Sequence, residues 1–226
     1  MTQEDKIKFF DRIEYLGFPL DQFYSEMQDK FQLVFHFTVS GKGAKGDINW
    51  WLQDSSRIAT CAIIDWRGIF NQLFSTSYWG WHIGAGNINL EKYSIGIEID
   101  SWGPLMEKDG FWYPVKKNSW TGKYQPNIKL KPIPSTDICF FKEPWRGFIA
   151  YEKFTKEQIE TCRLFCLYCN EKFKIPLDYK EEMWDVSESA LRGEPGIWTH
   201  ASYIDYKTDC MPQPEFIEML KSLKQE

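Results

Sequence analysis

The chain of 226 residues contains three histidines, His36, His82 and His200, so a metal or acid–base site that uses imidazole has few candidates. His36 and His200 are far apart in the sequence, and the segment after His200 contains Asp209 and Cys210. Two distant histidines followed by a carboxylate form a set of three ligands, and a catalytic zinc takes three protein ligands while keeping a fourth position for water. Each histidine could equally be an ordinary imidazole with satisfied hydrogen bonds, and spacing alone leaves both interpretations open.

The elements that must position these residues can be predicted from the periodicity of the apolar side chains. The segment 31–40 alternates, with phenylalanines and a leucine on one face and His36 on the other, and it is expected to be a strand. The segment 94–100, SIGIEID, alternates in the same way, with isoleucines on one face and Glu98 among the polar residues of the other. Both candidate side chains are therefore predicted to lie on the polar faces of strands.

Further elements are expected along the rest of the chain. Helices are predicted over 4–16, over 156–173 and from Pro214 onward, strands over 57–65, 69–74 and 196–200, and loops over 40–47 and 77–89. The helix over 156–173 has the clearest signal, because Thr155 and Gln158 form a capping box ahead of an apolar stripe. Strands mixed with helices in irregular order indicate an α/β or α+β domain with one central sheet.

The segment 101–148 shows no sustained period, and it contains Trp102, Trp112, Trp120 and Trp145 among many Pro, Gly and Lys residues. We expect a loop-rich insertion with one or two short strands inside a single domain over 1–226. Polar residues and prolines separate its lysines along the sequence, and we interpret these lysines as a solvated face.

Composition narrows the classes of function. The net charge of −5 argues against a nucleic-acid binder, and 11 Trp among 17% aromatic residues suggest an aromatic-lined groove that suits sugar faces. The first residues lack the pattern of a secretory signal, and no apolar stretch is long enough to span a membrane. We therefore expect a chain that is cytoplasmic as synthesised, has no membrane-spanning segment, and keeps its six cysteines reduced.

Four segments resemble the motifs of the zinc-dependent N-acetylmuramoyl-L-alanine amidases, in the order that this family has: VFHFT (34–38), WHIGAG (81–86), SIGIEI (94–99) and HASYIDYKTDC (200–210). The family includes phage amidase-type lysozymes, cytosolic muropeptide-recycling amidases and animal peptidoglycan recognition proteins. The resemblance covers roughly residues 31–220. It implies an α/β fold with a central mixed sheet flanked by helices and a zinc groove along one side.

The resemblance also implies a ligand set for Zn²⁺. His36 and His200 match the first two ligands, and Asp209 matches the third. This sequence has Cys210 and Met211 where the family usually has Pro-Gly. Because some phage members use a cysteine as the third ligand, Cys210 is a rival of Asp209.

Roles in hydrolysis follow in the same way. The scissile bond of the family joins N-acetylmuramic acid to L-alanine, and zinc would lower the pKa of a bound water to about 7. Glu98 resembles the base that moves the proton of this water, and Lys207 resembles the donor to the developing oxyanion. The alternatives are an exposed strand carboxylate and a solvated loop lysine.

Residues of the WHIGAG region are expected near the substrate. His82 is assigned substrate contact or structural support, and Trp79 and Trp81 could stack on sugar or peptide or pack in the core. Asn87 and Asn89 are candidates for binding groups of the peptide stem.

Two other kinds of metal site are disfavoured by the sequence. Cys162, Cys166 and Cys169 have a spacing similar to that of iron–sulfur enzymes, but they lie on the apolar stripe of a predicted helix, where cysteine behaves as a small hydrophobic residue. An iron oxygenase triad would need an acid two residues after a histidine, and no histidine here has one.

The predicted function is therefore hydrolysis of peptidoglycan by a monomeric zinc amidase of the phage endolysin type, released to the cell wall through a holin-type pore. The alternatives are a peptidoglycan-binding module of the same fold that does not cut, a cytosolic muropeptide-recycling amidase, and a zinc hydrolase of an unrelated fold.

Overall fold

The predicted strand around His36 is the second strand from one edge of a mixed sheet that organises the chain. The computed structural model describes residues 1–119 and 121–225, so Trp120, named above, lies outside the described residues. The described part of the chain contains a six-stranded sheet in the order β1-β4-β3-β5-β2-β11. Its strands are β1 (Ile13–Tyr15), β2 (Gln32–Phe37), β3 (Ala62–Ile64), β4 (Phe70–Gln72), β5 (Ser94–Ile99) and β11 (Gly196–Thr199). Only β3 and β4 pair antiparallel within it.

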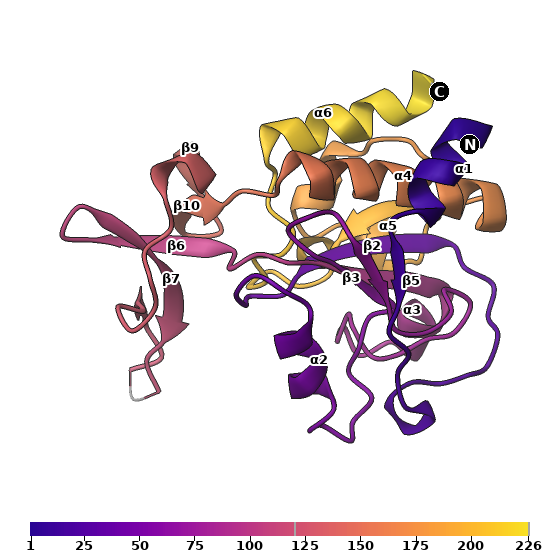
Figure 1. Cartoon of the computed structure of the whole chain (residues 1–226), viewed down its shortest axis with the longest axis horizontal. Helices are drawn as coiled ribbons and strands as arrows, with labels where there is room; N and C mark the ends of the chain where they lie inside the picture. Colours follow the sequence, from indigo (N-terminus) through magenta and orange to yellow (C-terminus); the bar gives the residue numbers. More distant parts are fainter. Residues whose placement is uncertain (120, 226) are drawn as a thin grey trace.

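Helices lie on both sides of this sheet. The helices are α1 (Gln3–Phe10), α2 (Lys45–Trp51), α3 (Ile88–Tyr93), α4 (Lys156–Phe173), α5 (Glu188–Leu191) and α6 (Pro214–Ser222), and short 3₁₀ turns are η1 (Leu20–Gln22), η2 (Ser135–Asp137), η3 (Glu181–Trp184), η4 (His200–Ser202) and η5 (Leu223–Gln225). Helices α1, α4 and α6 lie together above the sheet, whereas α2 lies below it (Figure 1). The α/β fold with a central mixed sheet flanked by helices is thus confirmed.

The two faces of β2 separate the core from the candidate site. Phe35 packs against Phe216 of α6, with ring centroids 5.3 Å apart, so its face of the strand is turned toward the helices. His36 lies on the opposite face, and it pairs in register with Glu98 of β5. The alternation of the sequence correctly predicted that His36 points away from the phenylalanine face.

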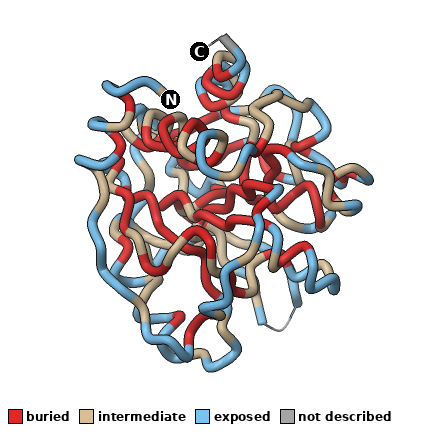
Figure 2. Tube along the Cα trace, turned by 90° about the vertical axis from the view of Figure 1, so that its right-hand side faces the viewer, coloured by how far each residue is buried: buried red, intermediate tan, exposed pale blue. Residues whose placement is uncertain are grey.

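Buried residues form a continuous core around the sheet, which Figure 2 shows as the red segments in the middle of the molecule. Helix α4 begins with the predicted capping box, in which Thr155 accepts from the Gln158 amide and Gln158 accepts from the Thr155 amide. Its three cysteines are buried and free, and they pack as apolar side chains. In the described residues, no helix is both long and apolar enough to cross a membrane.

The segment expected to be a loop-rich insertion instead contains a second sheet, which corrects that prediction. Five antiparallel strands follow the order β8-β7-β6-β10-β9 in the described residues. They are β6 (Pro104–Lys108), β7 (Phe111–Lys117), β8 (Tyr124–Pro126), β9 (Ile138–Trp145) and β10 (Phe148–Glu152). This added sheet projects from one side of the molecule (Figure 1). The sequence hides it because both of its faces are partly exposed, so apolar and polar residues do not alternate regularly.

Other boundaries also differ from prediction. The helix expected over 4–16 ends at Phe10, and Ile13–Tyr15 forms strand β1, which pairs in parallel with β4. That pairing is made with residues far along the chain, so local periodicity does not show it. The strand expected over 57–65 is confined to Ala62–Ile64, and the ends of the two predicted loops belong to helices α2 and α3.

Candidate metal centre and groove

Three side chains from separate elements converge at the polar face of the central sheet. His36 lies near the end of β2, His200 begins the turn η4 directly after β11, and Asp209 lies in the loop that follows. His200 Nδ1 is 2.9 Å from His36 Nδ1 and 2.8 Å from Asp209 Oδ2, which is 3.2 Å from His36 Nδ1. All three residues are buried. Parallel pairing of β11 with β2 brings the ends of both strands to the same edge, which explains the convergence.

The second nitrogen of His200 has a partner that fixes its proton. His200 Nε2 is 2.8 Å from the carbonyl oxygen of Ile83. A carbonyl only accepts, so we assign the proton to Nε2 and a lone pair to Nδ1.

A chain of hydrogen bonds assigns His36 in the same way. Ser94 Oγ donates to the carbonyl of Leu90 at 2.5 Å, so it can accept from His82 Nε2, which is 2.8 Å away. His82 then accepts at Nδ1 from His36 Nε2, at 3.0 Å. This leaves the lone pair of His36 on Nδ1, directed at the centre. His82 is therefore a support of His36 as well as a residue of the groove.

The electrostatics of the cluster suit a cation. Burial, and then the charge of His200, lower the pKa of His36 to about 3, and burial lowers the pKa of His82 well below its ordinary value. Both imidazoles are therefore neutral near pH 7. Burial opposes ionisation of Asp209, but the positive charge that the two adjacent histidines carry when protonated, and the hydrogen bonds they can then donate, hold its pKa below the usual range. Two nitrogen lone pairs and a carboxylate oxygen converge without a proton between the nitrogens, so a divalent cation would remove their repulsion.

The loop that carries His82 is held by a residue that the sequence did not single out. The carboxylate of Glu91 accepts from the backbone amides of His82, Ile83 and Gly84, at 2.8–3.0 Å. Gly96 leaves the space for the His82 ring, since a Cβ at this position would lie 2.7 Å from it. Glu91 and Gly96 thus fix the support of His36 from two sides.

Glu98 and Lys207 both line the groove that contains the three converging side chains. Oε2 of Glu98 is buried and has no hydrogen-bond partner among the described residues. Burial, with the charges of Asp209 and Asp47, raises the pKa of Glu98 well above its ordinary value, and Lys207 opposes this rise. Glu98 is therefore a half-buried residue whose carboxyl group can hold or release a proton beside the centre.

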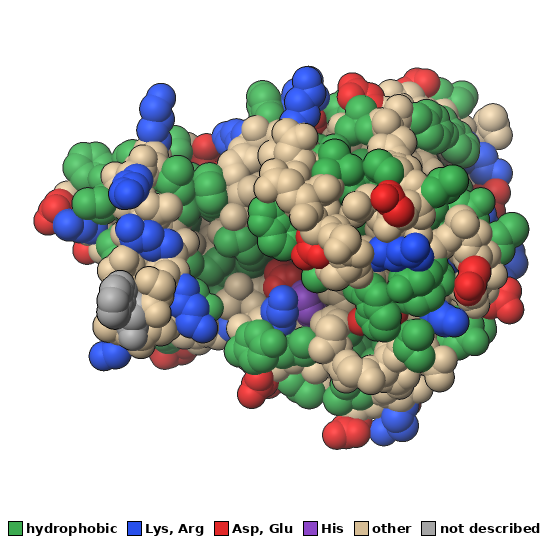
Figure 3. Space-filling view, turned by 90° about the horizontal axis from the view of Figure 1, so that it is seen from below, with side chains coloured by type: hydrophobic (Ala, Val, Ile, Leu, Met, Phe, Trp, Pro, Cys, Tyr) green, Lys and Arg blue, Asp and Glu red, His purple; other side chains and the backbone are tan. Residues whose placement is uncertain are grey.

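The groove has a volume of about 640 Å³ and opens beside the added sheet, where Figure 3 shows a hollow with a histidine at its floor. Four tryptophans line it: Trp50 and Trp51 from α2, Trp81, and Trp102. The high tryptophan content of the sequence predicted such a wall, although helix α2 was not predicted as its source. Flat rings of this kind can pack against sugar faces or peptide.

Three residues considered from the sequence lie elsewhere. Trp79 is buried against Tyr24, with stacked rings 3.9 Å apart, and it does not line the groove. Asn87 is the N-cap of α3 and accepts from the Asn89 amide, also outside the groove. Cys210 is fully buried in the core, and burial raises the pKa of its thiol well above the ordinary value. The structure therefore brings Asp209, and not Cys210, to the two imidazoles.

The added sheet is joined to the loop between His200 and Asp209. Arg146, in the turn between β9 and β10, donates to the carbonyl of Asp205, to the carbonyl of Ala201 at 3.2 Å and to the carboxylate of Asp185 at 2.9 Å. The same loop is closed by the Ala201 amide, which donates to the carbonyl of Asp209 at 2.8 Å. Arg146 is a positioning residue that no motif in the sequence indicated.

Comparisons with known proteins agree with this arrangement. Similar solved structures include PlyL (TM-score 0.53, 12% identity, covering 93% of this chain and 97% of that one) and the PlyG catalytic domain (TM-score 0.52, 9% identity, 94% and 93%). The amidase LysC from Clostridium intestinale URNW has a TM-score of 0.50 at 11% identity, with 94% and 97% covered. At such identities the likeness shows the fold alone. No curated protein sequence matches the chain.

The family model described as N-acetylmuramoyl-L-alanine amidase matches residues 31–214, which include β2, β5, β11 and the loop after them. The chain therefore belongs to the N-acetylmuramoyl-L-alanine amidase family, whose members are hydrolases of peptidoglycan.

Proposed function

We propose that this enzyme is a zinc-dependent amidase that cleaves the bond between N-acetylmuramic acid and L-alanine, and that it acts as an endolysin-type enzyme on the cell wall. The observation that carries the proposal is the convergence of His36 Nδ1, His200 Nδ1 and Asp209 Oδ2. With bonds of about 2.0–2.1 Å to a tetrahedral zinc, two ligand atoms are roughly 3.3 Å apart. The three separations of 2.8–3.2 Å are close to that spacing.

The donor types also favour zinc. Two neutral imidazoles and one carboxylate are a common zinc ligand set, and hard cations such as Mg²⁺ prefer all-oxygen ligands. When bound, zinc would polarise the scissile carbonyl and activate a water as the nucleophile. Cys210 is left as a core residue, because a neutral buried thiol is a poor ligand.

Glu98 is placed to act as the base. In our proposal it takes a proton from the attacking water and delivers it to the leaving nitrogen of alanine. Its buried Oε2 has no hydrogen-bond partner in the described part of the chain, so no such bond must be broken there for it to receive the proton. Its raised pKa describes the chain without a cation, and a bound cation would lower it toward the range of a working base.

Lys207 is assigned the stabilisation of negative charge on the carbonyl oxygen. It lines the same groove as Glu98 and is carried by the loop that joins His200 to Asp209. A fixed cation that meets charge only as it develops favours the transition state over the bound substrate. Trp81 and the other tryptophans of the groove would hold the sugar and the first residues of the stem peptide.

We further propose that residues 1–226 act as one monomeric amidase domain. Phe148 and Tyr151 of the added sheet belong to the same buried cluster as the central sheet, which supports a shared core.

The proposal is tested with a small soluble muropeptide and with purified peptidoglycan, by following newly freed amino-terminal alanine. Release should stop with a chelator, return with zinc, and be lost in His36→Ala, His200→Ala and Asp209→Ala, while Cys210→Ala keeps it. Binding to the wall without any release would instead support a recognition module. Release of amino-terminal alanine at the same rate with and without chelator would refute the zinc mechanism.

A further inference from the structure

We propose that the added sheet is a binding surface for peptidoglycan glycan strands that carry anionic stem peptides, and that it holds the substrate next to the groove. This inference rests on the proposed function, because it names how the same enzyme engages an intact wall. It replaces the interpretation of the lysines of this segment as a merely solvated face.

The charge of the added sheet is opposite to that of the rest of the protein. Residues 104–152 contain eight Lys and Arg and five Asp and Glu, a formal charge of +3, whereas the whole chain carries −5, which leaves −8 elsewhere. Figure 3 shows basic side chains on this lobe beside the hollow. Such a separation favours an anionic partner at the sheet while repelling it from the remaining surface.

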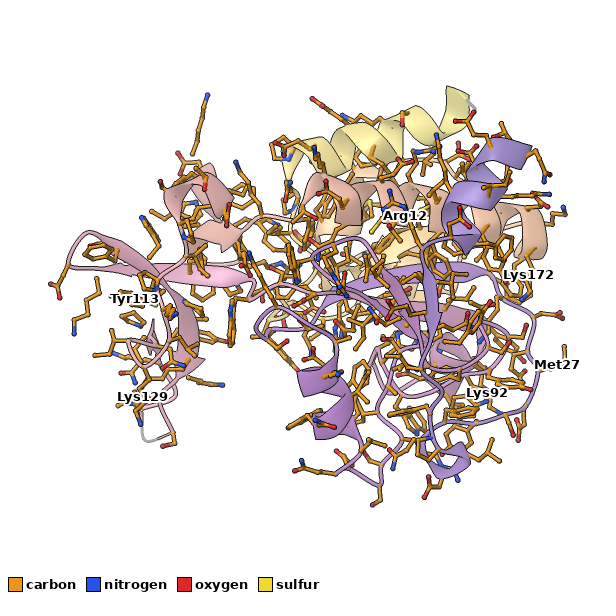
Figure 4. All side chains as sticks on the ribbon, viewed as in Figure 1. Arg12, Met27, Lys92, Tyr113, Lys129 and Lys172 are labelled. Carbon is orange, nitrogen blue, oxygen red and sulfur yellow. The ribbon has the colours of Figure 1, made fainter. Side chains whose placement is uncertain are left out.

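The lysines of the sheet are available to a partner. Six are exposed, and one is half-buried: Lys108, Lys117, Lys123, Lys129, Lys131 and Lys142, and Lys116. None of them forms a salt bridge with any residue that the structure describes. Lys129 lies at the end of the lobe that is farther from the central sheet (Figure 4). Because no described carboxylate pairs with these lysines, their ammonium groups are available to an anionic partner.

An aromatic pocket lies on the same sheet. It has a volume of about 430 Å³, and Trp112, Tyr124 and Phe148 line it. Tyr124 is 46% exposed, and its ring meets that of Phe148 edge to face at 5.2 Å. A partly exposed ring beside a pocket of this size can take the apolar face of a pyranose, while neighbouring lysines meet carboxylates of the stem peptides.

The pocket adjoins the catalytic machinery. Arg146 lines the pocket, and it donates to the Ala201 carbonyl directly after the proposed ligand His200. A single glycan strand of the substrate can therefore contact the pocket and extend toward the groove. Nucleic acid is the less suitable polyanion, since a long duplex would also meet the strongly negative remainder of the chain.

The experiment compares two variants with equal charge and different location. The first is the sheet variant, with Lys117, Lys123, Lys129 and Lys131 changed to Gln. The second is a control with Lys6, Lys8, Lys156 and Lys224 changed to Gln, on the helices and chain ends of the main body. Both are made in the full chain with and without Glu98→Gln, which should hold the substrate uncut.

Binding is measured by co-sedimentation with purified peptidoglycan that has been freed of phosphate-containing polymers. Because each exposed charge contact contributes little and four are removed, the sheet variant should bind about tenfold more weakly and with a smaller salt dependence. The control should bind like the parent, and both should cleave a small soluble muropeptide at the parental rate. Tyr124→Ala should also weaken binding, whereas Tyr15→Ala, on exposed β1, should not.

Equal loss of binding in both four-lysine variants, or loss in neither, would overturn the proposal. So would binding that requires phosphate polymers on the wall, or equal binding to duplex DNA that the sheet variant also loses. Failure of the proposed function is a separate outcome, because it appears as absent zinc-dependent cleavage of the soluble muropeptide, which the sedimentation measurement does not involve.

Discussion

Replacing His82 with phenylalanine should weaken zinc binding while leaving the protein folded. His82 accepts from His36 Nε2 at 3.0 Å and donates to Ser94 Oγ at 2.8 Å. Phenylalanine keeps the flat ring that lies over Gly96 but removes both nitrogens. The change therefore isolates the hydrogen bonds of His82 from its packing.

The size of the effect follows from the two proton positions of His36. Without zinc, His36 can move its proton to Nδ1 and donate to Asp209, whose Oδ2 is 3.2 Å away. With zinc on Nδ1, the proton must stay on Nε2, where the variant offers no acceptor. An unsatisfied buried donor costs about 1–3 kcal/mol, and that cost falls mainly on the zinc-bound state. The dissociation constant for zinc should rise roughly tenfold to hundredfold.

The measurement is competition for zinc between the folded protein and a chromogenic chelator. His82→Gln is the rescue variant, since its side-chain oxygen can accept from His36, and it should recover much of the affinity. Trp81→Phe is the matched control, because Trp81 lines the same groove without a hydrogen bond to a proposed ligand. A His82→Phe protein that is folded and binds zinc as tightly as the parent would refute the role of this chain of hydrogen bonds.

Three further outcomes are expected. Glu98→Gln should lower kcat by about 10²–10⁴-fold. Because the folded state raises the pKa of Glu98, the stability of the parent falls as the pH rises above the pKa that this group has in the unfolded chain. Without a cation, the variant should therefore resist urea better than the parent at pH 8 but not at pH 4, and equal urea midpoints of the two proteins at both pH values would contradict this. Arg146→Ala should speed amide exchange in residues 201–207 about tenfold and lower kcat, with Arg192→Ala, an exposed arginine whose ion pair is with Glu194, as the unchanged control. Glu91→Gln should destabilise the fold by about 1–3 kcal/mol in thermal unfolding, because all three backbone amides lose a charged acceptor and at least one of them faces an NH2 group instead of an oxygen; an unaltered melting temperature would count against the clamp.

Elements and side-chain orientations were predicted correctly from the sequence where a pattern of a few neighbouring residues determines them. Alternation around His36 and Glu98 placed both on polar strand faces, and their register partnership follows from parallel pairing of β2 with β5. The capping box at Thr155 fixed the start of α4 within the chain itself. Such features depend on neighbours within a few residues, so they need no knowledge of the tertiary fold.

Supporting residues could not be found in this way. Glu91 looks like any helix carboxylate until the fold brings three backbone amides to it, and Arg146 looks like a turn residue of an irregular segment. Trp79 has the composition of a groove residue, yet its burial is decided by Tyr24, more than fifty positions earlier in the chain. These roles depend on long-range packing, which a single sequence does not encode in any local period.

The hydrogen bonds between Arg146 and the loop after His200 limit how the added sheet can be removed or exchanged. Although the added sheet projects like an appendage, its β9–β10 turn supplies a guanidinium group to the backbone between the second and third proposed ligands. Trimming the lobe, or exchanging it for that of a relative, would remove this fastening together with the lysines. Modular engineering of the protein should therefore retain the turn, and a graft that keeps Arg146 should tolerate a new outer surface more readily than a clean excision. Evolution of wall preference in this lobe would be subject to the same restriction.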